Sequence, residues 1–289
     1  MRSKIYHVTT VHPRNDTRIF RKICSDLASD GYDTHLLVAD GMCKKIDRGV
    51  TITSIDIKRR FLMRLLVTHY KLMRHFLKKQ DMVIVHMHDP ELLILAVILS
   101  FTHHKIVFDF HEDVSKQILD KHYIPTILRK VIAVFYLVVL KVAKNRIDGI
   151  VAATPAIMYG LDVKNQNSIV VNNYLSTKDL LDDGNAKAVD AGFTFEKNKK
   201  YFCYIGLISL DRCIMELIEC MRFLPKNFHL ILAGRLESEY VEKLVLKAKL
   251  SGNVSYLGIV ERSEMQKICS NSFVSLLLFK PTGNHLESQ

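Results

Sequence analysis

Short apolar runs that alternate with helical periods are the feature of this sequence that most limits its fold. Residues 82–86 (MVIVH) and 105–110 (KIVFDF) are continuous apolar runs of strand length, and residues 91–101 between them have the length and composition of a helix. Continuous apolar strands indicate a sheet covered on both faces, and strands separated by helices are usually parallel. Further strands are expected in this half at residues 4–11, 34–39, 50–55, 149–153 and 168–171. We therefore predict an α/β fold with a parallel sheet.

A polar stretch at residues 176–200 lacks an apolar period and separates this half from a second strand–helix series. The second series has strands at residues 201–205, 228–233, 254–256 and 273–279, with helices between them. We predict an N-terminal domain at residues 1–180, an interdomain segment at 181–199 and a partial second domain at 200–289. The length of 289 residues suits two modest domains.

The positive charge is concentrated in the first half of the chain. Residues 1–150 hold 25 Lys and Arg against 15 Asp and Glu, a balance of +10 out of the total +11. Residues 58–79 contain eight cations and no acid, with apolar residues at helical spacing between them. This amphipathic helix is either an ordinary surface helix or a contact with an anionic membrane surface. A nucleic-acid partner is not expected, because no stacking aromatics or nucleic-acid motif accompany the charge.

A second apolar stretch, residues 124–146, is flanked by cations and is either a buried helix or another membrane-facing one. The longest continuous apolar run has ten residues, at 131–140, which is too short to span a membrane. The six Cys contain no C-x-x-C pair, and the 13 His are scattered along the chain. We therefore expect reduced thiols and no metal site.

Four polar clusters follow predicted strands, at the edge where parallel α/β sheets bind ligands. They occupy residues 12–18 (HPRNDTR), 86–91 (HMHDPE), 109–113 (DFHED) and 206–212 (GLISLDR). Single polar loops at strand ends are common. Four in one chain favour a binding or catalytic role.

These segments, with AATPAI, VVNNY, LAGR and YLG, resemble in order the retaining family 4 glycosyltransferases of bacterial surface-polysaccharide synthesis, such as capsule and lipopolysaccharide. The resemblance spans residues 4–287, and HDPELL and DFHED are its most specific parts. It implies a GT-B architecture of two Rossmann-like parallel-sheet domains, the second incomplete. It also implies transfer of a sugar from a UDP- or GDP-linked donor, without a further cofactor, to a lipid-linked or polysaccharide acceptor. The enzyme would be cytoplasmic and peripheral on the inner face of the cell membrane.

The resemblance assigns roles to individual residues. His111 matches the active-site His of the family, and Asp16 and Arg18 lie on the acceptor side, although a structural Asp16–Arg18 pair is equally compatible with the sequence. Gly206 and Arg212 fall on the donor side, where a cation meets the charge that develops on the diphosphate leaving group.

Glu287 matches the first of two donor-binding Glu residues of the family. Among the neighbouring polar residues, Asp109 and Glu112 are expected to brace their loop. His88 and Asp89 are expected to cap a helix that begins at Pro90.

Three departures from the family pattern are visible. Leu207 replaces a second Gly, Cys213 replaces the Gly after the basic residue, and the second Glu of the pair would lie beyond Gln289. The chain is therefore expected to be C-terminally truncated. Two alternatives to a transferase stay open: a non-catalytic GT-B module or partner subunit, and a sugar-nucleotide epimerase of the same architecture.

Overall fold

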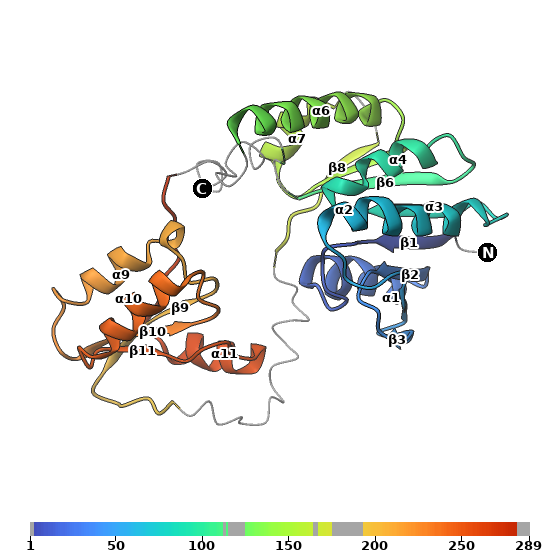
Figure 1. Ribbon diagram of the computed structural model, residues 1–289. Coiled ribbons are helices and arrows are strands. Elements are labelled where there is room, and N and C mark those ends of the chain that lie inside the picture. Colours follow the sequence, from blue (N-terminus) through green and yellow to red (C-terminus); the bar gives the residue numbers. More distant parts are fainter. Residues whose placement is uncertain (1–2, 112–113, 115–124, 164–166, 175–192, 282–289) are drawn as a thin grey trace. The chain divides into compact units, whose positions relative to one another are not determined.

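The computed structural model describes residues 3–111, 114, 125–163, 167–174 and 193–281. The chain divides into two compact units, Met1–Tyr174 and Leu175–Gln289 (Figure 1). Each unit contains a sheet of its own, as expected from the two series of strands.

The first unit is built on an eight-stranded sheet in the order β3-β4-β2-β1-β5-β6-β7-β8. All neighbouring strands are parallel except β3, which runs antiparallel to β4. The strands are β1 (Lys4–Val8), β2 (Asp33–Val38), β3 (Lys45–Asp47), β4 (Val50–Ser54), β5 (Ile84–Met87), β6 (Lys105–Phe110), β7 (Gly149–Ala152) and β8 (Ser168–Val170). The predicted parallel sheet is confirmed. The edge strand β3 was not predicted, because its sequence is short and polar.

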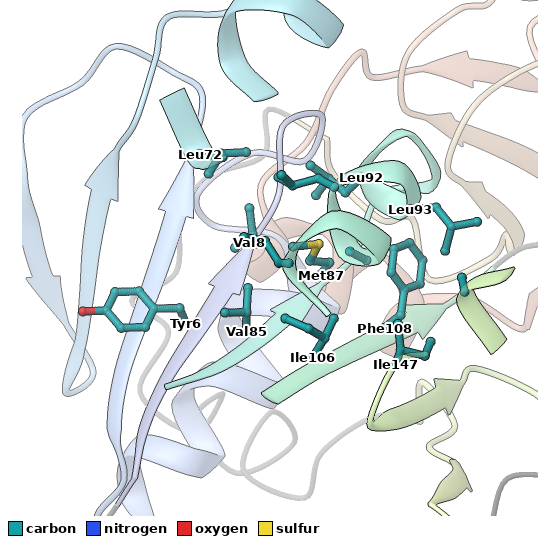
Figure 2. Close-up of a cluster of buried hydrophobic side chains, with 14 of the residues drawn as sticks. Tyr6, Val8, Leu72, Val85, Met87, Leu92, Leu93, Ile106, Phe108 and Ile147 are labelled. Carbon is teal, nitrogen blue, oxygen red and sulfur yellow. The ribbon is translucent and has the colours of Figure 1, made fainter. Parts of the chain in front are cut away.

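Helices cover both faces of this sheet. Because successive side chains of a strand point to opposite faces, neighbouring residues of one strand belong to different cores. On β2, Leu37 belongs to the larger core, whereas Leu36 and Val38 belong to the opposite one. The larger core lies under α3 (His69–Leu77), α4 (Leu93–Leu99) and α6 (Thr126–Lys144). Figure 2 shows Val85, Met87 and Phe108 of its central strands packed together.

The opposite face is covered by the first helix, which runs as η1 (Thr17–Cys24, with π-type hydrogen bonding) into α1 (Ser25–Ser29). Ile19, Phe20 and Cys24 of η1 pack against β2 and β4 in the smaller core. The sequence pattern indicated one helix over residues 17–30, and its extent is confirmed although its first half is wider than an α-helix.

The predicted basic helix begins at Phe61 and consists of α2 (Phe61–Met63), η2 (Arg64–Thr68) and α3. Acids from outside the stretch neutralise several of its cations. Asp56 accepts hydrogen bonds from Arg59 and Lys71, and Glu91 accepts them from Arg64. The surface is therefore less positive than the acid-free sequence suggested.

Helix α6 is not a buried helix. Ala133, Leu140 and Ala143 face the core, whereas a broad apolar stripe of the same helix is exposed to solvent. The exposed residues are Ile127, Leu128, Val131, Val134, Phe135, Leu137, Val138 and Val142. Among the described residues, no helix is both long and apolar enough to cross a membrane.

The second unit contains a four-stranded parallel sheet in the order β11-β10-β9-β12. Its strands are β9 (Lys200–Ile205), β10 (Phe228–Ala233), β11 (Val254–Tyr256) and β12 (Val274–Ser275). Helices α9 (Ile214–Cys220) and α10 (Glu239–Lys249) cover one face, and α11 (Arg262–Asn271) covers the other. The strand predicted at residues 273–279 is wrong in length, because regular pairing with β9 ends at Ser275.

Two further short helices belong to the first unit. The turn η3 (Pro90–Leu92) leads into α4, and α7 (Pro155–Leu161) follows β7. Thr154 caps α7 by accepting the backbone N–H of Ile157, and Pro155 occupies its first turn. The segment AATPAI of the sequence is thus a strand end followed by a capped helix.

Candidate functional site

The polar clusters of the first unit meet at the carboxyl ends of β1, β5 and β6. Alternation along these strands places His7, His86 and Asp109 on the sheet face covered by η1, because their neighbours Val8, Val85 and Phe108 lie in the core on the other face. His7 and His86 are register partners on adjacent strands. The fold therefore gathers ionisable side chains that lie 23 to 102 residues apart in the chain.

Asp109 is the centre of this cluster and is almost fully buried. Its two carboxylate oxygens accept hydrogen bonds from Nε and Nη2 of Arg18 at 3.0 and 2.8 Å. Nδ1 of His88 lies 3.1 Å from Oδ2, and Nδ1 of His111 lies 3.3 Å from the same oxygen. Burial alone raises the pKa of Asp109, but the contacts with His111, His88 and Arg18 outweigh it and hold the pKa far below its usual value. The carboxylate is therefore charged, and the prediction that Asp109 braces its loop is confirmed.

Arg18 joins the first helix to two strand ends. Besides the bidentate contact with Asp109, Nη1 of Arg18 donates to the backbone carbonyl of Val171, at 2.8 Å. The alternative of an Asp16–Arg18 side-chain pair is wrong, because the guanidinium is directed to Asp109. Asp16 instead caps η1 by accepting the backbone N–H groups of Arg18 and Ile19.

Asp16 also contacts a histidine of its own loop. Its Oδ2 is 3.4 Å from Nδ1 of His12. Burial by itself raises the pKa of Asp16, and the hydrogen bonds from His12 and from the backbone of Ile19 overcome this effect, so that the pKa is lowered. Asp16 thus carries charge beside an imidazole at the start of the first helix.

The predicted capping role of His88 and Asp89 is wrong. Asp89 stands at the N-cap position of η3 without a side-chain capping bond. Its carboxylate instead accepts hydrogen bonds from the hydroxyl of Thr9 and from the backbone N–H groups of Thr10 and Val11. Asp89 therefore fixes the loop after β1, which carries the first polar cluster.

His111 lies at the rim of a small pocket that begins directly after β6. The pocket is lined by His88, Pro90, Phe108, Asp109, Phe110, His111 and Val114. The ring of His111 packs edge-on against His12, with centroids 5.6 Å apart. Both ring nitrogens of His111 are buried without a hydrogen bond among the described residues, and Nδ1 makes only the 3.3 Å contact with Asp109. The imidazole therefore lies beside the carboxylate and leaves Nε2 without a partner in the part of the chain that the structure describes.

On the second unit, glycines mark the carboxyl ends of β9 and β10. Gly206 and Gly234 have φ of +149° and +137°, and a Cβ on Gly234 would lie 1.8 Å from the carbonyl oxygen of Gly206. The two loops therefore approach each other more closely than any side chain allows. Leu207, which follows Gly206, is partly exposed at this edge, and its carbonyl accepts the hydroxyl of Tyr204.

Arg212 belongs to the short turn η5 (Leu210–Arg212) that follows β9. Its guanidinium lies over the ring of Phe279, 4.1 Å from the centroid. The next residue, Cys213, has a left-handed φ of +54°, which is the conformation that a Gly adopts most easily. The departure from the family pattern at Cys213 therefore falls on a position whose backbone still demands Gly-like geometry. Glu287 and Glu112 lie outside the described residues.

Sequence reasoning did not identify His7 or the role of Asp89. The signal for His7 was its position in the alternating run IYHV, where it shares a face with Ile5 and not with Tyr6. His86 lies on β5, and His88 follows two residues later, just beyond the strand end. Combined with these two histidines, the pattern around His7 indicates a polar strip across two strands. The partners of Asp89 are backbone groups, which no residue pattern reveals.

No family model matches the chain, and no curated protein matches it. Solved structures, however, match it over nearly its whole length. The Anabaena protein HepE in complex with UDP and glucose superposes with a TM-score of 0.63 at 12% identity, covering 98% of this chain and 76% of its own. The E. coli trehalose-6-phosphate protein bound with UDP-2-fluoro glucose gives 0.69 at 11% identity, with 95% and 78% covered.

The α,α-trehalose 6-phosphate synthase of Burkholderia multivorans gives a TM-score of 0.65 at 13% identity and covers 96% of this chain and 78% of its own. These likenesses extend over both units, and each unit contains a parallel sheet between helices. The chain therefore has the GT-B fold, with two Rossmann-like domains.

Proposed function

We propose that the chain is a retaining glycosyltransferase that uses a UDP- or GDP-linked sugar. The observation that carries this proposal is the buried, charged Asp109 cluster at the carboxyl ends of β1, β5 and β6 in a GT-B fold. Parallel sheets bind their ligands at this edge. The similar structures of HepE and of the E. coli protein contain UDP or a UDP-sugar, which supports a nucleotide-sugar donor.

His111 is the proposed catalytic residue of the first unit. Its Nδ1 faces Asp109, so the carboxylate favours a proton on that nitrogen and an open lone pair on Nε2. A sugar that develops positive charge during transfer is stabilised by such a polar group next to its ring. The pocket beside His111 has room for a group about the size of a hydroxyl.

Gly206 and Arg212 are the proposed donor residues of the second unit, together with Glu287. The close approach of Gly206 and Gly234 keeps side chains away from these two strand ends, while their own N–H groups donate to the carbonyls of Ala233 and Gly258. The guanidinium of Arg212 supplies positive charge for a diphosphate, and its stacking on Phe279 limits the orientations it can take. The diphosphate leaving group would be stabilised by this charge as its bond to the sugar breaks.

We further propose that the acceptor is a glycolipid or polysaccharide and that the protein acts at the cytosolic face of a membrane, bound to anionic lipid. The basic helix has apolar side chains on its outer surface, with Leu62 and Leu66 each about 70% exposed. Arg60, at the start of this helix, and Arg74, within it, have no ion pair with any residue that the structure describes. Apolar side chains beside cations are the combination that binds anionic interfaces.

The donor is tested by calorimetric titration of the 289-residue chain with UDP-glucose, GDP-mannose and the free nucleotides. We expect saturable binding of one nucleotide sugar, weakened at least tenfold in Arg212→Gln. Lys226→Gln is the control, because it removes one positive charge from a loop of the same unit away from Arg212. This variant should bind the nucleotide sugar like the unmodified chain. Absence of binding for every nucleotide, or equal binding by Arg212→Gln, would contradict the donor site.

The membrane surface is tested by co-sedimentation with vesicles that contain phosphatidylglycerol. We expect binding that weakens as salt is raised, because exposed charges are screened. The double variant Leu62→Ser/Leu66→Ser should bind poorly. Its control, Leu250→Ser/Ile259→Ser, removes two side chains of similar exposure from the second unit and should bind like the unmodified chain. Equal binding by both variants would refute the assignment of this surface.

A further inference from the structure

Three histidines form a cluster on the polar face of the first sheet. His7 and His86 are register partners on β1 and β5, and His88 lies two residues beyond His86 on the same face. All three are buried, and the rings of His86 and His88 stack with centroids 4.5 Å apart. One ring nitrogen of each lies within 4.8 Å of the corresponding nitrogens of the other two.

The hydrogen bonds in this cluster determine which ring nitrogen of His88 carries a proton and which carries a lone pair. Because Asp109 is a charged acceptor, Nδ1 of His88 donates to it and Nε2 of His88 carries a lone pair. That lone pair lies 3.0 Å from Nδ1 of His7. A carboxylate behind an imidazole in this way is the usual support of a metal-binding His, since it fixes the tautomer and orients the ring.

Two nitrogens of the cluster are not satisfied by the protein. Nε2 of His7 and Nε2 of His86 are buried and have no hydrogen-bond partner among the described residues. Burying a polar atom without a partner is costly. A metal ion held by Nδ1 of His7 and Nε2 of His88, which lie 3.0 Å apart, would also take up a lone pair of His86. Metal–imidazole bonds of about 2.0–2.1 Å separate tetrahedral ligands by about 3.3 Å, close to the present His7–His88 spacing.

We propose that His7, His86 and His88 bind a divalent transition-metal ion of the Zn²⁺ class, with Asp109 as the outer-sphere partner of His88. Three imidazoles without a carboxylate favour Zn²⁺, Co²⁺ or Cu²⁺ over Mg²⁺ and Ca²⁺, which prefer oxygen. A second cluster of His88, Asp109 and His111 is less suited, because both oxygens of Asp109 are bonded to Arg18.

This inference differs from the expectation of no metal site, which rested on spacing along the chain. His7 is 79 residues before His86, so no local motif joins them, and only the pairing of β1 with β5 brings them together. The two histidines of the H-x-H segment share a face because successive strand residues alternate. The third ligand comes from the neighbouring strand at the same level of the sheet.

The test is equilibrium dialysis of the chelator-treated 289-residue chain against Zn²⁺, with the bound metal measured directly. We expect one tightly bound Zn²⁺ per chain and at least a tenfold loss of affinity in His86→Gln. The matched control is His229→Gln. Among the described residues, His229 is a buried histidine of the second unit that also has an unpartnered ring nitrogen but belongs to no cluster of possible ligands. The control should bind Zn²⁺ like the unmodified chain.

Co²⁺ and thermal unfolding provide independent readings. Co²⁺ should give the intense visible bands of a tetrahedral nitrogen site without a thiolate charge-transfer band, which excludes the six free cysteines as ligands. Zn²⁺ should raise the melting temperature of the unmodified chain and of His229→Gln, whereas Mg²⁺ should not. No Zn²⁺ binding, a thiolate band, or equal affinities of His86→Gln and His229→Gln would overturn the proposal. If His86→Gln does not fold, the stabilisation of the unmodified chain by Zn²⁺ and the Co²⁺ spectrum decide it.

Discussion

Arg18 and Asp109, 91 residues apart in the chain, form a buried bidentate ion pair with nitrogen–oxygen distances of 2.8 and 3.0 Å. The pair joins the first helix to the end of β6 and supports the two histidines that also contact Asp109. Its two parallel hydrogen bonds define the orientation of the carboxylate as well as its charge. The geometry around His88 and His111 therefore depends on a residue of a distant helix.

Replacing Arg18 by Met should destabilise the first unit strongly. The carboxylate of Asp109 would stay buried without its cation, a change that typically costs about 3–5 kcal/mol. Arg14→Met is the control, because Arg14 pairs with Asp40 in a more exposed position, where loss of the pair should cost at most about 1 kcal/mol. Chemical denaturation of both variants measures the difference. Similar losses of unfolding free energy in the two variants would show that burial does not increase the cost of removing the cation from the Arg18–Asp109 pair.

Replacing His111 by Ala should remove most sugar transfer and leave the fold intact. His111 lines the small pocket at the edge of the sheet and is partly exposed, so its truncation removes a polar group without opening the core. We expect a loss of at least 100-fold in kcat, within the range for a positioned polar group at a reacting centre. His103→Ala, at an exposed position of the same unit, is the control. Near-normal turnover by His111→Ala would remove this residue from the site.

Replacing Cys213 by Gly should stabilise the second unit. Cys213 is held at φ +54°, where a side chain costs about 1 kcal/mol that Gly avoids. Gly252→Ala is the reverse change at φ +78° in open space and should cost a similar amount. Thermal unfolding compares them. A destabilised Cys213→Gly variant would mean that the cysteine side chain makes packing contacts worth more than the backbone strain.

Stability should fall as the pH is lowered from about 6.5 to 4, in part because of His75. Burial, reinforced by Lys79 and His35, lowers the pKa of His75 to about 4. Between pH 6.5 and pH 4, His75 is therefore protonated in the unfolded chain but stays neutral in the folded chain. Its contribution to the unfolding free energy is complete above pH 6.5 and is lost as the pH approaches 4.

The measurement is the unfolding free energy at several pH values for the unmodified chain and for His75→Gln. The variant should lose less stability across the window, because glutamine does not titrate. His103→Gln serves as the control at an exposed site. Parallel pH profiles for the unmodified chain and His75→Gln would contradict the lowered pKa.

The sheets were predictable because their central strands are read directly from continuous apolar runs such as residues 82–86 and 105–110. Edge elements were less visible. The strand β3 has only three residues, two of them charged, and β12 is a two-residue remnant of a longer apolar run. Strands of this kind are defined by the backbone of their neighbour, which the residue pattern does not encode.

The candidate site was predictable in outline but not in its contacts. Strand-end clusters marked the right edge of the sheet, and Asp109 was correctly expected to brace its loop. The partners were wrong where they lie far away in the sequence: Arg18 pairs with Asp109 and not with Asp16, and Asp89 bonds to the loop after β1 and not to its own helix. Local spacing favours local partners, whereas a parallel sheet brings distant strand ends together.

The long reach of Arg18 also has a consequence for the order of assembly on the ribosome. At about 5–20 residues per second, the carboxylate of Asp109 is synthesised roughly 5–20 s after Arg18, and the carbonyl of Val171 later still. Until then the first helix carries a guanidinium at a position that is buried in the finished sheet. The early chain must therefore keep this helix loosely attached, and its docking is completed only after the central strands have emerged.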